Sequence, residues 1–173
     1  MKRAFLSRRA IFLAPLLLVF AFCSLSCKAD SAQLSDRINS AFSSEIRITH
    51  GDVCLYASLS VSSVSPDMSR DIRLCFSSPE AVSGMTLETK DGKTSVSFNG
   101  FSLPCDTEIP ISREICEMFT VSVGMTLKES LTGGEILAIA DGDTEIIFDK
   151  SARPLSLSRN GVSVEILSFS LSD

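Results

Sequence analysis

The residue types that perform catalysis are scarce in this chain of 173 residues. His50 is the only histidine, and it stands in the segment 49–52, which has the composition of a strand end followed by a turn. A nucleophilic triad needs a histidine between a hydroxyl or thiol and a carboxylate, and a zinc site needs a set of several ligands. Because no such set can be assembled around His50, we expect neither an enzyme nor a cofactor or metal.

Two short motifs imitate ligand-binding loops. Gly92-Lys93-Thr94 matches the end of a phosphate-binding loop, but the earlier glycine that this loop requires falls on Leu87. Asp141-Gly142-Asp143 resembles the start of a calcium loop, whose twelve-residue ligand pattern is missing. We therefore interpret both motifs as turns between strands.

Four cysteines follow the first 27 residues. They are Cys54, Cys75, Cys105 and Cys116. None has CxxC spacing, so metal binding and thioredoxin-like chemistry are not indicated. Disulfides are permitted outside the cytoplasm, and Cys105 and Cys116 bracket the entrance to a predicted helix, which allows a bridge between them. The alternative is four reduced, half-buried thiols, and we prefer it.

The N-terminus has the layout of an export signal. Four basic residues, Lys2, Arg3, Arg8 and Arg9, precede an apolar run of 13 residues from Ala10 to Phe22. Such a run is too short to span a hydrocarbon core of ~30 Å as a helix, but it suits the central region of a secretory signal. We predict that residues 1–26 form a signal peptide.

Cys27 ends this region. The segment Ser24-Leu25-Ser26-Cys27 resembles the lipobox of bacterial lipoproteins, in which a small residue precedes a cysteine that receives a diacylglyceryl group. The resemblance implies a lipidated Cys27, a tether over residues 27–33 and a folded domain over residues 34–173. The protein is then anchored on the outer side of the cell membrane or on a periplasmic face. The alternative is cleavage near Ser26 or Ala29, which leaves a secreted protein.

The charge of the chain excludes one class of partner. The full chain has a formal charge of −5, and residues 1–26 hold four of its 16 basic residues and none of its 21 acidic ones, so the remainder carries −9. Nucleic acids are bound mainly through basic side chains. We therefore expect no nucleic-acid partner, contact with the membrane through the lipid anchor, and a monomer.

Two segments have helical spacing. Leu34, Ile38 and Phe42 recur at every fourth residue, which places them on one face of a helix. The second segment covers about residues 111–122, where Ile115 and Phe119 repeat in the same way and Pro110 occupies a first helical position. We expect an interruption of this second helix near Gly124 and its end at Gly133-Gly134.

The rest of the chain alternates between apolar and polar residues, which predicts strands with one apolar face. The nine expected strands cover residues 45–51, 53–64, 72–76, 85–89, 94–98, 135–140, 144–149, 155–159 and 162–171. Asp91-Gly92, Asp141-Gly142 and Asn160-Gly161 are signals for tight hairpins. The expected fold class is α+β: a curved antiparallel sheet of about nine strands in a meander, with one or two helices on its concave side.

Three stretches carry a family resemblance: residues 76–104, the helix after Pro110, and residues 144–170. Their layout resembles the LolA/LolB-like lipoprotein-carrier fold, an incomplete barrel whose helices lie on the concave side of the sheet. The resemblance implies a half-barrel domain that binds the acyl chain of a lipid or a lipidated protein in its concave face.

The expected ligand-binding residues are apolar positions of that face. They are Leu55, Leu59, Leu74, Phe76, Leu87, Val96, Phe98, Phe119 and Phe148. Two functions stay open at this point: an envelope lipoprotein that binds a hydrophobic ligand in an open cup, and a structural or interaction lipoprotein whose cup is a filled core. The alternating pattern cannot separate them because both require the same residues.

Overall fold

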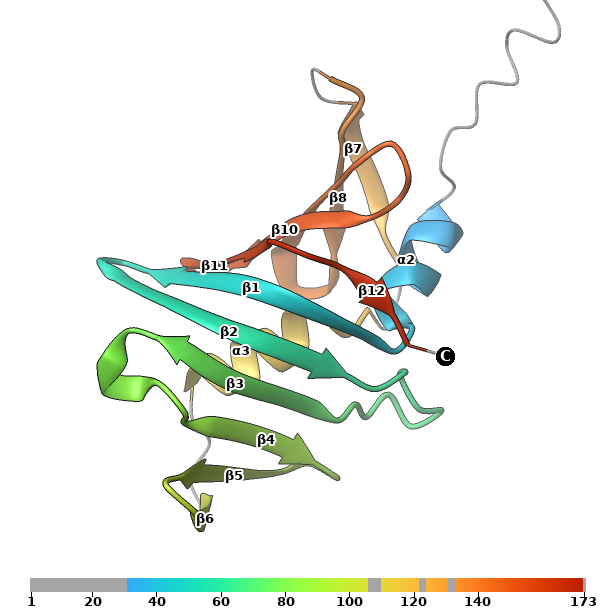
Figure 1. The fold of residues 1–173 in the computed structure, drawn as a ribbon. Helices are drawn as coiled ribbons and strands as arrows, with labels where there is room; N and C mark the ends of the chain where they lie inside the picture. The colour runs from blue at the N-terminus through green and yellow to red at the C-terminus, as the bar shows by residue number, and fades with distance from the viewer. Residues whose placement is uncertain (1–30, 106–109, 122–123, 131–132, 173) are drawn as a thin grey trace, which may run out of the picture.

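The computed structural model of the protein describes residues 31–105, 110–121, 124–130 and 133–172. The predicted signal peptide and Cys27 lie outside these residues. Within them, one twelve-stranded antiparallel sheet is accompanied by two α-helices, α2 (Ser31–Asn39) and α3 (Pro110–Met118) (Figure 1). None of the helices in the described part of the chain is long and apolar enough to cross a membrane.

The first half of the sheet is a meander in which each strand pairs with the next. Its strands are β1 (Phe42–His50), β2 (Val53–Val61), β3 (Ile72–Ser78), β4 (Thr86–Lys90), β5 (Lys93–Phe98) and β6 (Phe101–Cys105). A short 3₁₀ helix, η1 (Glu80–Val82), precedes β4. Asp91-Gly92 and Asn99-Gly100 close two of the hairpins with positive φ at both residues, which is the backbone that Asp, Asn and Gly accept most readily.

The second half is another meander. It consists of β7 (Thr126–Ser130), β8 (Ile136–Ala140), β9 (Thr144–Phe148), β10 (Pro154–Arg159) and β11 (Val162–Ile166), with the 3₁₀ turn η2 (Asp141–Asp143) between β8 and β9. The two halves join because β1 pairs with β11, and the short β12 (Ser170–Leu171) pairs with the start of β1. The sheet is open, since β6 and β7 end the strand order.

The hydrophobic core lies on the inner face of the sheet, where the helices pack. Along β2, Ala57, Leu59 and Val61 are at most 3% exposed, while Ser58 and Ser60 between them point to solvent. Helix α2 contributes Leu34 and Ile38 to this core. From α3 and the residue after it come Ile115, Met118 and Phe119, all fully buried. The predicted alternation and the α+β fold class are thus confirmed.

The strand count is the main correction. The structure has twelve strands where about nine were expected, because residues 101–105 and 126–130 also form strands and the expected last strand, 162–171, divides into β11 and β12. Residues 126–130 were considered as a continuation of the second helix. Five residues are too few to distinguish the periodicity of a helix from that of a strand. Pairing with β8 makes this segment a strand.

The first helix is also displaced from its predicted position. It begins at Ser31, within the expected tether, and ends at Asn39, so that Phe42 opens β1. The side-chain amide of Asn39 donates to the carbonyl oxygen of Val121 at 2.9 Å and accepts from its N–H at 3.1 Å. Phe42 stays in the core, with its ring 5.5 Å from that of Phe119, but it arrives there from a strand.

Candidate functional site

The inner-face side chains become much more exposed toward one edge of the sheet. One residue from each strand between β2 and β6 forms a row in register: Leu59, Leu74, Leu87, Val96 and Leu103. The first three are at most 2% exposed, Val96 is half-buried, and Leu103 is 68% exposed. The same apolar row therefore begins as core and ends in solvent.

A second row repeats the gradient. Phe76 on β3 is 4% exposed, whereas Phe98 on β5 is 42% exposed and its partner Phe101 on β6 is 78% exposed. In Figure 1, α3 crosses behind β2 and β3, and β5 and β6 lie beyond it at the lower end of the sheet. We call the four large apolar side chains on the inner face of β5 and β6 the apolar wing. They are Val96, Phe98, Phe101 and Leu103.

The backbone of β6 disfavours the pairing of a further strand with this edge of the sheet. In a ladder closed by a two-residue turn, Phe101 and Leu103 direct their backbone groups toward β5, so Ser102 and Pro104 face the free edge. Pro104 has no N–H, and proline on an edge strand impedes pairing with a further strand. The wing therefore offers apolar side chains without a complete backbone template, which suits a ligand that needs no hydrogen bonds.

The structure places the expected ligand-binding residues in two different environments. Six of them lie in the core at no more than 4% exposure: Leu59, Leu74, Phe76, Leu87, Phe119 and Phe148. Leu55 and Val96 are half-buried, and Phe98 is exposed. The six core residues are already in contact with the protein's own side chains, so in this conformation they offer a ligand no surface.

Two residues of the wing were not predicted from the sequence as part of a ligand-binding site. Phe101 and Leu103 are the most exposed of the large apolar side chains among the described residues. A signal for them was present, because Asn99-Gly100 is a hairpin dipeptide followed by an apolar residue at every second position. The expected strands left residues 101–105 unassigned, because none was predicted between residues 94–98 and 135–140.

Small polar side chains continue the inner face beyond the apolar wing. Thr89, Thr94 and Cys105 lie in register on β4, β5 and β6, and the hydroxyl oxygens of the two threonines are 3.1 Å apart. Cys116 of α3 lies near Thr89. Burial raises the pKa of the Cys116 thiol. This end of the wing can therefore accept or donate hydrogen bonds.

A buried arginine holds the two helices over the sheet. Arg70 precedes β3 and is 7% exposed. Its Nη1 donates to the carbonyl oxygens of Ile38, at 2.6 Å, and of Phe119, while Nη2 donates to that of Ser40. Its Nε donates to the carbonyl oxygen of Ser62 at 2.6 Å. Burial lowers the pKa of Arg70 to about 10, so it stays charged at neutral pH.

The acceptors explain the position of this charge. Three of the four carbonyls lie at or just beyond the C-terminal ends of α2 and α3, where helix carbonyls lack partners and the helix dipole is negative. One cation thus satisfies both helix ends at once. No spacing in the sequence predicts this role, because it depends on two helices that are far apart along the chain.

The other residues considered for chemistry remain separate. The four cysteines within the described residues are free, with Cys54 exposed and the others half-buried. His50 ends β1, Gly92 lies in the β4–β5 turn and Lys93 begins β5, and Asp141–Asp143 forms η2. Among the residues that the structure describes, no group of three or more His, Cys, Asp or Glu side chains is placed to hold a metal ion.

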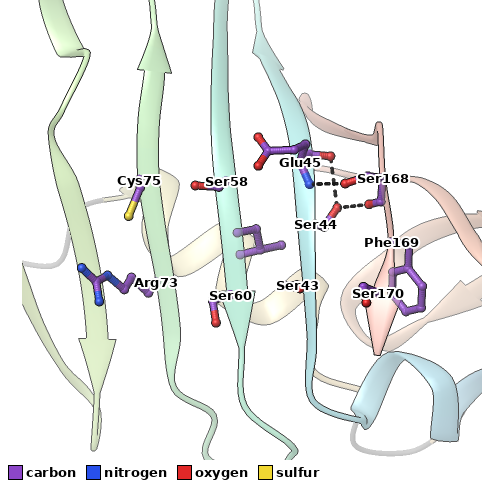
Figure 2. A pocket seen from close by; sticks show the side chains of 11 residues that line it. Ser43, Ser44, Glu45, Ser58, Ser60, Arg73, Cys75, Ser168, Phe169 and Ser170 are labelled. Carbon is purple, nitrogen blue, oxygen red and sulfur yellow. Dashed lines mark hydrogen bonds between the residues drawn. The ribbon is translucent and has the colours of Figure 1, made fainter. Parts of the chain in front are cut away.

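A small hollow of about 280 Å³ lies on the outer face of the sheet (Figure 2). Its lining is rich in serine: Ser43, Ser44, Ser58, Ser60, Ser168 and Ser170, together with Glu45, Arg73, Cys75, Leu59 and Phe169. The Ser44 hydroxyl donates to the carbonyl oxygen of Ser168 at 2.5 Å, and the Ser168 hydroxyl accepts from the Glu45 N–H at 2.9 Å. These bonds fix the connection between β11 and β12, and nothing in the hollow selects a ligand.

Comparison with known proteins bears on the architecture. No protein-family profile and no curated protein match the chain. Among solved structures, an uncharacterized conserved protein from Thermus thermophilus is similar at 15% identity and a TM-score of 0.47, over 83% of this chain and 89% of that one. A LolA superfamily protein from Nitrosomonas europaea has 10% identity, a TM-score of 0.45, and coverage of 83% and 92%.

A third solved structure is an outer membrane lipoprotein-sorting protein domain from Vibrio parahaemolyticus, with 9% identity, a TM-score of 0.42, and coverage of 82% and 91%. The open, curved antiparallel sheet with helices on its inner face agrees with the curved sheet and the helices that the sequence predicted. Likenesses at this level concern the fold alone and say nothing about a ligand.

Proposed function

We propose that this protein is an exported, non-enzymatic lipoprotein that binds the hydrocarbon chain of a lipid or of a lipidated protein on its apolar wing. The observation that carries the proposal is the exposure of Phe98, Phe101 and Leu103, at 42%, 78% and 68%, on the face that elsewhere forms the core. A covering hydrocarbon gains ~0.8 kcal/mol for each buried CH₂. The wing thus supplies affinity without any specific polar contact.

The proposal shifts the ligand from the centre of the concave face to its edge. Of the nine residues expected from the sequence, Val96 and Phe98 belong to the wing, and Phe101 and Leu103 join them. Export by residues 1–26 and anchoring through Cys27 complete the proposal. The basic and apolar order of that segment and its likeness to a lipobox support both.

Dye binding tests the wing directly. The double variant Phe101→Ser/Leu103→Ser of the full chain should bind N-phenylnaphthylamine, an uncharged hydrophobic dye, about thirtyfold more weakly than the wild type, because each of the two changes removes roughly half a buried side chain, or on the order of 1 kcal/mol. Fluorescence titration measures this. The matched control is Leu167→Ser/Leu171→Ser, which alters two apolar side chains, 50% and 43% exposed, away from the wing. Equal binding by all three proteins contradicts the proposal.

The second candidate is an envelope interaction module that docks a protein on the same wing. The filled centre of the concave face favours it, since Leu74 and Phe119 are fully buried. Native mass spectrometry of the protein purified from its envelope fraction separates the two functions. A bound lipid mass that is lost in the Phe101→Ser/Leu103→Ser variant supports hydrocarbon binding. A bound polypeptide that is lost in the same variant supports the second candidate.

A further inference from the structure

The inner face of β5 and β6 changes polarity along the strands. At one end Phe98 faces Phe101, in the middle Val96 faces Leu103, and at the other end Thr94 faces Cys105. Four residues separate the two ends on each strand, which corresponds to about 14 Å. The surface thus has an apolar end and a polar end, as an amphiphilic molecule does.

The polar end is able to bind a head group. Each threonine hydroxyl supplies one donor and two acceptor lone pairs, and the 3.1 Å contact between Thr89 and Thr94 uses only one donor and one acceptor. Thr94 and Cys105 are half-buried, so part of their surface is open to a ligand. Hydrogen-bonding capacity therefore remains beside the last apolar pair of the wing.

The charge of the same region defines the kind of head group. On β3 to β6 the inner-face residues of the three rows are uncharged, and the alternation places Lys90 and Lys93 on the outer face. At the nearby turn, the Asp71 carboxylate accepts the backbone N–H of Asp91 at 3.2 Å. These three rows offer a head group neither a cation nor a carboxylate, and the buried Arg70 that precedes β3 is already bound to backbone carbonyls.

We infer that the wing binds a single-chain amphiphile in one direction, with its tail against Phe98 and Phe101 and an uncharged, hydrogen-bonding head, such as a glycerol ester, at Thr94 and Cys105. The inference rests on the proposed function and adds the polarity and the orientation of the ligand. It follows from matching the apolar and polar ends of the ligand to those of the strands. The Cys105 thiol then lies beside the head group.

The position of Cys105 provides a directional test, because a thiol-reactive head group should find it. A thiolate adds to the C=C bond of a maleimide: the S–C bond forms, the neighbouring carbon takes up a proton, and nothing leaves. We compare N-ethylmaleimide with N-dodecylmaleimide on the reduced full chain and measure alkylation of each cysteine by peptide mass spectrometry. Cys75 is the matched control, since it is half-buried like Cys105 but lies on the outer face.

The dodecyl reagent should raise the rate at Cys105 relative to Cys75 by at least about tenfold over the ethyl reagent, since two extra ordered CH₂ contacts already correspond to roughly that factor. Phe98→Ser/Phe101→Ser should abolish the increase. If N-phenylnaphthylamine binds the wing but Cys105 is not favoured, the orientation is wrong and the proposed function survives. If neither reagent nor dye binds at the wing, the proposed function itself fails.

A displacement assay tests the head group separately. Monododecanoylglycerol should displace the dye from the wild type at a lower concentration than dodecanoate at pH 8, where the carboxylate of the latter is charged. Thr94→Val should weaken the glycerol ester by about fivefold, as expected for one lost hydrogen bond, and leave dodecyl hydrocarbon binding unchanged. Equal potency of the two amphiphiles, or no effect of Thr94→Val, overturns the assignment of an uncharged head.

Discussion

At the scale of single residues, Arg70 and Phe101 show opposite departures from the usual distribution of side chains. A charged residue is buried at 7% exposure, and an aromatic residue is 78% exposed. Buried charges are retained where they are paired or hydrogen-bonded, and Arg70 meets this condition through backbone carbonyls. Phe101 has no comparable compensation within the described residues, and a ligand is the compensation that we propose.

Replacement of Arg70 should be costly. Arg70→Met removes the donors for four carbonyl oxygens and should lower the free energy of unfolding by about 3–5 kcal/mol, the range observed when one partner of a buried charged network is lost. Urea denaturation measures the change. Arg73→Met is the control, because Arg73 is exposed on the neighbouring strand, and it should stay within about 0.5 kcal/mol of the wild type. An equal loss of unfolding free energy in both variants would contradict the stabilising role of the buried Arg70 contacts.

At the scale of elements, α3 is attached to the sheet at its C-terminal end and along one side. Arg70 binds the carbonyl just beyond its C-terminus, and its outward side chains meet the β10–β11 hairpin. There, Arg159 Nη1 lies 2.7 Å from Glu117 Oε2, and Asn160 Nδ2 lies 3.1 Å from Glu114 Oε2. A nine-residue helix has little stability of its own, so these contacts and its buried face determine its position.

Loss of Arg159 should therefore loosen α3 without unfolding the sheet. In Arg159→Met, amide hydrogen exchange of the described α3 residues should become about five- to tenfold faster, because a half-buried ion pair contributes roughly 1 kcal/mol. Amides of β1 to β3 should exchange at unchanged rates. Arg153→Met is the control, since its 3.3 Å pair with Asp149 is exposed and lies within one turn. Faster exchange throughout the molecule would contradict a local role.

The elements that the sequence predicts correctly are those with strong local signals. Strand β2 alternates over nine residues, and Asp91-Gly92 and Asn160-Gly161 mark their hairpins through the positive φ that these residues accept. Strands β7 and β12 have five and two residues, and their conformation is set by pairing with β8 and β1. The contacts of Arg70 were unpredictable for the same reason, because they depend on tertiary structure.

At the scale of the whole molecule, two meanders share one core through the pairing of β1 with β11. This pair joins residues more than a hundred positions apart. Each meander therefore defines its own turns, but the inner face is complete only when β1 and β11 pair. Local patterns predicted the hairpins and the curved sheet, but as one meander, and the pairing of β1 with β11 divides it into two. They could not predict which strands would end the sheet, and the apolar wing exists because β6 is one of these ends.

The placement of the molecule in the cell is the last prediction. If Cys27 carries the anchor, Cys27→Ala should move the exported protein from the membrane fraction to the soluble fraction, because roughly 0.8 kcal/mol per buried CH₂ is lost with the acyl chains. Immunoblots of the two fractions, and a mass shift for the acylated N-terminus, measure this. Cys23→Ala is the matched control: it lies in the same region, but bulky Phe22 precedes it where a lipobox requires a small residue. Membrane attachment that survives Cys27→Ala, with no acyl group on the wild type, would contradict lipidation and favour the secreted alternative.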